Sequence, residues 1–264
     1  MTRTELARMI DHTLLAPTAS DGDVRALVRE AVELGVGAVC VSPTMVRVAA
    51  KAITSEGAAA GIAGGSIVVA SVVGFPSGAH RLAIKVAEAG TAVADGAAEV
   101  DLVADLAAVV AGNADPVAAE VEAVRAAVGP AVTLKVILES AVVLADDGGD
   151  RRLAEACRAA ADAGADLVKT STGVHPAGGA TTEAVAMMAA AVAGRGSTTV
   201  GVKASGGIRS ADVAIAMVEA GATRLGASAS RAILDGLPAD PSGAPRAPAR
   251  SDPGPGTGTS EEPS

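Results

Sequence analysis

Short apolar segments recur along the chain and are separated by longer stretches with a different pattern. Each segment is rich in Val, Ile, Leu or Ala, and its length and β-branched content are typical of a buried strand. The segments span residues 9–14, 38–42, 67–74, 99–103, 132–138, 166–170, 200–204 and 224–226. We therefore expect eight buried strands.

The stretches between these segments are Ala-rich and have helical spacing. One apolar stripe comprises Val24, Leu27, Val28, Ala31 and Val32, which lie on a single helical face. Helix boundaries are indicated by Asp115-Pro116 and Ser210, which are typical N-cap signals, and by Gly35 and Gly221, which are typical of helix C-termini.

Strands that alternate with helices form right-handed βαβ units and a parallel sheet. Eight such units in 264 residues favour a closed (β/α)₈ TIM barrel, and a doubly wound open sheet is the alternative that the pattern leaves open. We expect the barrel to span residues 1–235 and to carry a short N-terminal helix. Residues 236–264 are rich in Pro, Gly and Ser and predict a disordered tail.

Composition argues against a nucleic-acid-binding, a membrane-spanning and a secreted protein. The formal net charge is −9 and the chain has no Trp or Tyr, so it lacks the basic surface and stacking platforms typical of nucleic-acid binding. Residues 57–80 contain no Asp, Glu, Lys or Arg, but six glycines and a proline interrupt them, and we expect no membrane span. The start of the chain has no signal-peptide pattern and two cysteines make no disulfide framework, so a cytoplasmic protein is expected.

Charged residues lie on one face of five expected strands. In residues 99–103, Val100 and Leu102 share one face and Asp101 lies on the other. The same alternation defines the inward-facing set, which comprises Asp11, Asp101, Lys135, Lys169 and Lys203. One such residue is usually structural, but several charges inside an apolar barrel are costly unless they pair or function. The set therefore predicts an active site.

Lys169 and Lys203 lie on neighbouring strands, the sixth and the seventh. Two ammonium groups about 4 Å apart repel by roughly 4 kcal/mol at an effective dielectric near 20, and one pKa unit corresponds to about 1.4 kcal/mol. This repulsion is expected to lower the pKa of one lysine. At physiological pH, more of that lysine's amine would then be neutral. A neutral amine can attack a carbonyl and form a Schiff base.

Glycine-rich turns follow the last strands. Residues 204–209 (ASGGIR) follow the seventh strand, residues 226–230 (GASAS) follow the eighth, and Thr172-Gly173 follows the sixth. Glycine lets backbone N–H groups approach a phosphate, and in barrels the phosphate site often lies after strands seven and eight. We expect a phosphorylated ligand here, and the alternative is that the glycines only form tight turns.

Metal and nucleotide motifs are missing from the sequence. His12, His80 and His175 have no metal-ligand spacing, neither cysteine belongs to a CxxC pair, and GxGxxG is absent. We therefore expect neither a metal nor another cofactor. His12 follows an inward-facing aspartate and is expected to face outward or to have a structural role.

The order of the motifs resembles that of the deoxyribose-phosphate aldolases over residues 4–235, and KTSTG with KASGGIR is the most specific pair. The motifs are IDHTLL, VCVSP, VVGFPSG, GAAEVDLV, LKVILE, ADLVKTSTG, VGVKASGGIR and RLGAS. The resemblance implies a class I, metal-free aldolase on a (β/α)₈ barrel. Such an enzyme cleaves 2-deoxy-D-ribose 5-phosphate reversibly to D-glyceraldehyde 3-phosphate and acetaldehyde, in deoxyribonucleotide catabolism.

Roles follow from the resemblance by motif position. Lys169 resembles the Schiff-base lysine, Lys203 the second lysine that perturbs it, and Asp101 the residue that relays protons. Lys135 resembles a supporting neighbour. The residues that fall where the family holds the phosphate are Gly173, Gly206, Gly207, Arg209, Gly226 and Ser228.

The chain also departs from the family pattern. Ala229 follows Ser228 where members often have a second serine, and the C-terminal tyrosine of some members has no counterpart here. Another class I aldolase for a related phosphorylated sugar and a non-catalytic phosphosugar-binding barrel remain as alternatives. A homodimer is the assembly to consider.

Overall fold

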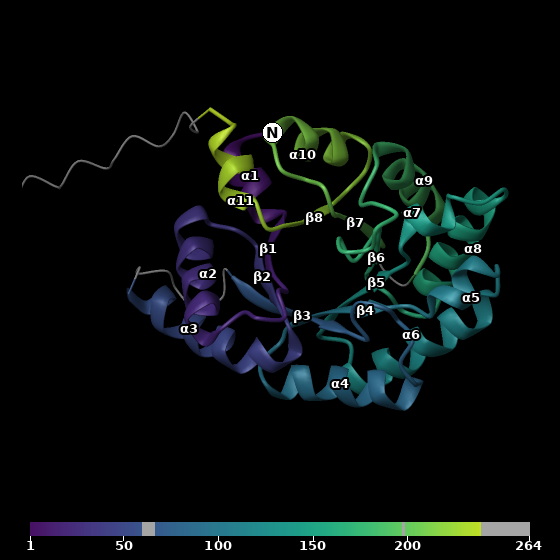
Figure 1. Ribbon diagram of the computed structural model, residues 1–264, viewed down its shortest axis with the longest axis horizontal. Coiled ribbons are helices and arrows are strands. Elements are labelled where there is room, and N and C mark those ends of the chain that lie inside the picture. The colour runs from purple at the N-terminus through teal and green to yellow at the C-terminus, as the bar shows by residue number, and fades with distance from the viewer. Residues whose placement is uncertain (60–66, 197–198, 239–264) are drawn as a thin grey trace, which may run out of the picture.

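The computed structural model describes residues 1–59, 67–196 and 199–238. Within them, eight parallel strands close into a barrel in chain order, with β8 paired to β1 (Figure 1). The strands are β1 (Ile10–Leu14), β2 (Ala38–Val41), β3 (Val68–Val73), β4 (Glu99–Val103), β5 (Thr133–Ile137), β6 (Leu167–Lys169), β7 (Gly201–Ser205) and β8 (Arg224–Ala227). Their ends lie within one residue of the expected ones. The TIM barrel is confirmed, and the open sheet is wrong.

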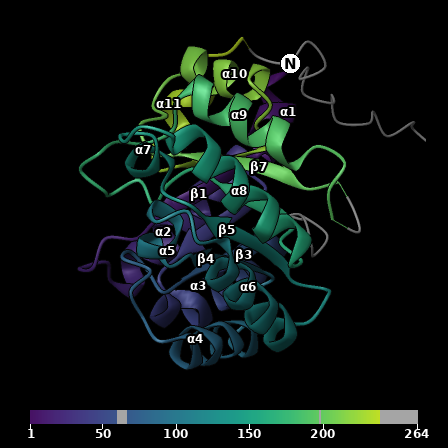
Figure 2. The same cartoon turned by 90° about the vertical axis from the view of Figure 1, so that its right-hand side faces the viewer.

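Helices surround the barrel, and Figure 2 shows α6 and α8 on the side of the strands that faces the viewer, with α4 below. The longer helices are α2 (Asp21–Leu34), α3 (Val46–Ala59), α4 (Leu82–Ala94), α6 (Ala114–Val128), α8 (Gly149–Asp162), α9 (Thr182–Val192) and α10 (Ala211–Glu219). The shorter ones are α1 (Arg3–Arg8), η1 (Pro43–Met45, a 3₁₀ helix), α5 (Leu106–Val110), α7 (Ser140–Val143) and α11 (Ser230–Asp235). The expected N-terminal helix is therefore present as α1.

Helix boundaries follow local hydrogen bonding. At the start of α2, Ser20 and Asp23 form a capping box, and Gly35 ends the helix in the left-handed region at φ 69°. The expected Asp115 cap of α6 is wrong. The helix begins two residues earlier than expected, at Ala114, and its N-cap is Asn113, whose side chain accepts a hydrogen bond from the backbone of Asp115. Aspartate and proline are also favoured within the first turn of a helix, which explains the error.

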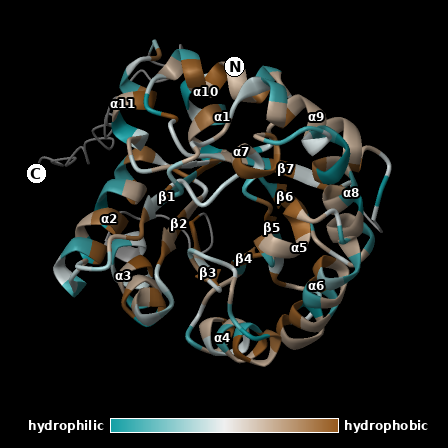
Figure 3. Ribbon diagram, turned by 45° about the vertical axis from the view of Figure 1, so that its right-hand side comes forward, coloured by the Kyte–Doolittle hydropathy of each residue, from teal (hydrophilic) through white to brown (hydrophobic). Residues whose placement is uncertain are grey.

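The main hydrophobic core lies between the strands and the helices. Buried Val100 and Leu102 of β4 belong to one apolar cluster with Val121 of α6 and Leu153 of α8. Helices α2, α3 and α4 alternate between brown and teal residues in Figure 3, as amphipathic helices do. This core is built from small and branched side chains, so the elements approach closely without aromatic residues.

The interior of the barrel is different. Strand register pairs Val72 with Asp101 and Ala70 with Cys40, so these side chains share the inward face. Cys40, Ala70 and Val72 form a small separate apolar cluster there. The inward-facing positions outside this cluster include the charged residues of β1, β4, β5, β6 and β7.

Two further expectations concern the chain as a whole. No helix in the described ranges is long and apolar enough to span a membrane. Residues 239–264 of the expected tail lie outside the described residues, and the domain boundary at residue 235 stays a prediction.

Candidate active site

A cavity of about 300 Å³ lies at the C-terminal ends of the strands. Lys169, the last residue of β6, lines it. The cavity is also lined by all the residues that were expected to hold a phosphate, namely Gly173, Gly206, Gly207, Arg209, Gly226 and Ser228. The structure therefore brings the reactive lysine and the glycine-rich loops to one site.

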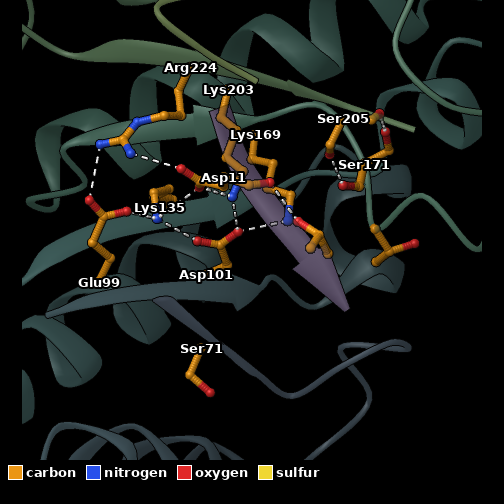
Figure 4. Close-up of polar contacts among 12 residues, drawn as sticks. Asp11, Ser71, Glu99, Asp101, Lys135, Lys169, Ser171, Lys203, Ser205 and Arg224 are labelled. Carbon is orange, nitrogen blue, oxygen red and sulfur yellow. Dashed lines mark hydrogen bonds and ion pairs between the residues drawn. The ribbon is translucent and has the colours of Figure 1, made fainter. Parts of the chain in front are cut away.

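Asp101 is the centre of a group of buried lysines. Its Oδ2 accepts hydrogen bonds from the Nζ atoms of Lys169 and Lys203, both at 2.7 Å, and its Oδ1 accepts one from Lys135 at 2.8 Å (Figure 4). Register explains the convergence, because Asp101 lies beside Lys135 and Lys169 lies beside Lys203 on paired strands. All four side chains are buried.

Two more carboxylates extend this group. Asp11 of β1 forms ion pairs with Lys203 and, at 3.6 Å, with Lys135. Glu99 of β4 pairs with Lys135 at 2.6 Å. Arg224, the first residue of β8, binds Asp11 at 2.7 Å and Glu99 at 3.0 Å.

Sequence reasoning missed Glu99 and Arg224 as members of the charged group. The signal was available for Glu99, because it lies two residues before Asp101 and therefore on the same face of the strand. Arg224 lies at the entrance of the last strand, where a basic residue is usually exposed, and only barrel closure brings it inside.

Lys169 has a lowered pKa. Burial is the largest cause, the Asp101 carboxylate opposes it, and the Lys203 ammonium lowers the pKa further. The expected effect of Lys203 is therefore present, although burial contributes more. Because both lysines bind one oxygen of Asp101 at 2.7 Å, their nitrogens are separated by no more than twice that distance.

The groups around Lys169 have pKa values shifted toward their charged forms, whereas the pKa of Lys169 is shifted toward its neutral form. Burial opposes ionisation of Lys203 and Lys135, but the neighbouring carboxylates outweigh it and raise both pKa values. Burial likewise opposes ionisation of Asp101 and Asp11, but the surrounding cations hold the pKa of Asp101 well below its usual value and lower that of Asp11 to about 2. Among these lysines, Lys169 is the one that loses its proton most readily.

The loops beside Lys169 approach one another closely. Gly173, Gly206 and Gly207 all have positive φ, between 82° and 87°. A Cβ at Gly206 would lie 2.8 Å from the Cα of Gly179, and one at Gly179 would lie 2.3 Å from the carbonyl oxygen of Gly206. Backbone groups therefore form this side of the cavity, an arrangement that suits an anion.

Glu139 supports the loop after β6. Its buried carboxylate accepts hydrogen bonds from the backbone and the hydroxyl of Thr172, the latter at 2.7 Å. Its φ of 49° is the one positive value at a non-glycine residue in the described part of the chain. The strained backbone aims the carboxylate at the segment that leads into Gly173.

His12, one of the three histidines considered as metal ligands, does not line the cavity. His12 is buried against the helices, where its Nδ1 lies 2.8 Å from the hydroxyl of Ser230 and its Nε2 lies 3.4 Å from Glu30. Burial lowers its pKa. Across the ranges that the structure describes, no group of three or more His, Cys, Asp or Glu side chains is placed to hold a metal ion.

A family model, the DeoC/LacD family aldolases, matches residues 6–236. The chain belongs to this family. It is 58% identical over 236 residues to the deoxyribose-phosphate aldolase of Mycolicibacterium paratuberculosis, covering 89% of this chain and 98% of the relative. It is 56% identical to the enzyme of the same name from Mycobacterium tuberculosis, covering 89% and 97%. The family resemblance inferred from the motifs is thus confirmed, and this member is an aldolase.

A solved structure of the family has the same fold. The tetrameric deoxyribose phosphate aldolase of Aeropyrum pernix superposes with a TM-score of 0.72 at 35% identity, covering 89% of this chain and 91% of that one. The aldolase described here therefore shares its barrel architecture with a relative of known structure.

Proposed function

We propose that this aldolase cleaves 2-deoxy-D-ribose 5-phosphate reversibly to D-glyceraldehyde 3-phosphate and acetaldehyde through a Schiff base on Lys169. The observation that carries the proposal is a buried lysine with a lowered pKa that lines a cavity together with glycine-rich loops. The names of the two relatives described above support the same substrate. The reaction belongs to deoxyribonucleotide catabolism in the cytoplasm.

The first steps use the neutral amine of Lys169. Its Nζ attacks the C1 aldehyde of the open-chain sugar, and the carbinolamine loses water to give an iminium ion. The iminium withdraws the electron pair of the C2–C3 bond, which breaks and leaves an enamine on the lysine. The C3 hydroxyl loses its proton and becomes the aldehyde of D-glyceraldehyde 3-phosphate.

Protons are moved by the groups around Lys169. Asp101 accepts hydrogen bonds from both Lys169 and Lys203, so it can take a proton from one and return one to the enamine carbon with the help of water. Lys203 keeps the site positively charged, and Lys135 holds the other oxygen of Asp101. Water then hydrolyses the second iminium and releases acetaldehyde.

The phosphate is held at the far end of the cavity by Gly173, Gly206, Gly207, Arg209, Gly226 and Ser228. Backbone N–H groups and the Arg209 guanidinium would bind its oxygens. Binding energy at this end fixes the aldehyde beside Lys169, because a substrate anchored at both ends loses little further entropy in the reaction. A homodimer remains the assembly that we propose.

Borohydride trapping tests the lysine. The aldolase is incubated with acetaldehyde and sodium borohydride, and the modified residue is identified by peptide mass mapping. We expect an ethyl group on Lys169 in the wild type and none in Lys169→Met. An adduct on Lys203, or activity that survives the substitution, would overturn the assignment.

The same preparation separates this proposal from its alternatives. Trapping without cleavage of 2-deoxy-D-ribose 5-phosphate would indicate another class I aldolase of the family. Neither trapping nor cleavage would indicate a phosphosugar-binding barrel, and loss of activity with a chelator would indicate metal-dependent chemistry.

A further inference from the structure

The barrel interior holds an unequal number of positive and negative groups. Three carboxylates and four basic groups are joined by ion pairs from the N-terminal to the C-terminal end of the strands (Figure 4). The carboxylates are Asp11, Glu99 and Asp101, and the basic groups are Lys135, Lys169, Lys203 and Arg224. If every group were charged, the interior would carry one excess positive charge.

We propose that Arg224 is a positioning residue that keeps Lys169 neutral, because it supplies the fourth cation to an interior that holds three carboxylates. The proposal rests on the proposed function in that Lys169 is taken as the Schiff-base lysine. Arg224 acts from the opposite end of the barrel and does not touch the cavity that holds the substrate.

The contacts show how Arg224 reaches Lys169. Its guanidinium bridges Asp11 at 2.7 Å and Glu99 at 3.0 Å, and its side chain is only 20% exposed. Asp11 in turn binds Lys203, which shares an oxygen of Asp101 with Lys169. Without Arg224, Asp11 and Glu99 would hold Lys203 and Lys135 more strongly, and Asp101 would be left to stabilise the Lys169 ammonium.

Unequal partnering decides which group gives up its proton. Lys135 contacts three carboxylates, at 2.6, 2.8 and 3.6 Å, and Lys203 contacts Asp11 and Asp101. Lys169 forms an ion pair with Asp101 alone among the described residues. Since an uncompensated buried charge is costly, the excess proton leaves the lysine with the fewest partners.

A cysteine thiol beside Lys169 does not alter this count. Cys40 of β2 faces the interior and interacts with Lys169, and burial raises the pKa of its thiol. The thiol is therefore neutral at physiological pH. The lowered pKa of Lys169 and the raised pKa values of Lys135 and Lys203 agree with the charge balance.

The test measures the protonation of Lys169 in Arg224→Gln. The full chain is pulse-labelled with acetic anhydride at a series of pH values, and acetylation of Lys169 is quantified by peptide mass mapping. Removing one cation balances the interior with Lys169 charged, so we expect the labelling midpoint to rise by about one pH unit, roughly a tenfold loss of neutral amine at fixed pH. The pH profile of kcat/KM should move by the same amount.

Charge variants make the prediction specific. Arg224→Lys keeps the charge and should keep the wild-type midpoint, and Glu99→Gln removes an anion and should lower it. The double variant E99Q/R224Q has the same charge excess as the wild type and should restore its midpoint. Arg231→Gln is the matched control, because Arg231 also bridges two carboxylates, Glu30 and Glu33, but on the surface.

Two results would overturn the proposal. One is an unchanged midpoint in folded Arg224→Gln, and the other is a rise in the double variant equal to that in the single one. If Arg224→Gln does not fold, Glu99→Gln replaces it in the test. A labelling midpoint of Lys169 that does not fall in Glu99→Gln would also overturn the proposal. Failure of the proposed function is recognised separately, because the wild type would then form no ethyl adduct on Lys169, whatever its labelling midpoint.

Discussion

Lys85 is a buried lysine with a purely structural environment. It lies on α4, where its Nζ donates to Glu120 of α6 at 2.7 Å and to the backbone carbonyl of Val103 at 3.0 Å. Glu120 also accepts a hydrogen bond from the backbone of Asp105. The pair ties two helices to the end of β4, and every polar atom of the lysine has a protein partner.

We expect Lys85→Met to destabilise the aldolase by about 3–5 kcal/mol, because it leaves the Glu120 carboxylate buried without a cation. Urea unfolding followed by circular dichroism measures the change. The activity of the folded fraction should be unaffected, since Lys85 does not contact the cavity.

The double variant K85M/E120Q provides the control. Its amide can still accept from Asp105 but carries no charge, so it should recover most of the lost stability. If the double variant is as unstable as Lys85→Met, the lost stability comes from altered side-chain packing and not from the unpaired charge of Glu120.

At the residue scale, the alternation of side chains along a strand was sufficient to predict the charged group. Successive residues point to opposite faces of the sheet, so the sequence places Asp101, Lys135, Lys169 and Lys203 on the inward face. Lys85 could not be found in this way. It lies in a helix, and its partner comes from another helix whose position depends on the whole fold.

At the scale of elements, the cavity depends on contact between two loops. The loop from β6 to α9 contains Gly179, and the loop from β7 to α10 contains Gly206. The backbone N–H of Ala180 donates to the carbonyl oxygens of Ser205 and Gly206, at 3.0 and 3.1 Å. Backbone hydrogen bonds therefore join the two loops.

We expect Gly179→Ala to separate the loops, because its Cβ would lie 2.3 Å from the carbonyl oxygen of Gly206. The KM for 2-deoxy-D-ribose 5-phosphate should rise by roughly tenfold, the loss of about one hydrogen bond to a charged group. The unphosphorylated sugar should be affected much less. Steady-state kinetics with both substrates measures the difference.

Gly90→Ala is the matched control, because a Cβ at this position in α4 would meet nothing within 4 Å. Alanine is a better helix former than glycine, so this variant should be as stable as the wild type or more stable. An equal loss for both sugars in Gly179→Ala would contradict a phosphate-specific role for the loops.

The strands were predictable and some helix details were not. Buried strands leave short apolar, β-branched segments in the sequence, and each one was located. Helices α5 and α7 have five and four residues, too few for a periodic pattern, and they form where Asp105 caps the chain or where Glu139 adopts positive φ. Such features depend on tertiary contacts.

At the scale of the whole molecule, the buried ion pairs couple stability to pH. The pKa of Asp11 is lowered from 3.8 to about 2, and that of Asp101 is also lowered. The folded state thus binds fewer protons than the unfolded state in this range. The stabilisation is complete above pH 3.8 and is lost as the pH falls toward 2.

We therefore expect the free energy of unfolding to fall by about 1.4 kcal/mol per pH unit for each such carboxylate. Urea titrations at a series of acidic pH values measure the slope. Asp11→Asn should be less stable than the wild type at neutral pH, and the gap should close as the pH falls, because protonated aspartate resembles asparagine. A constant gap would contradict this origin.

Closure of the barrel by β1 and β8 also orders the events of folding during synthesis. Asp11 and Arg224 are separated by 213 residues, so their ion pair forms only after nearly the whole barrel has left the ribosome. Until then the first seven strands expose two open sheet edges, and long-range closure is slow because of its entropic cost. We therefore expect the nascent chain to be most prone to aggregate shortly before its last strand leaves the ribosome.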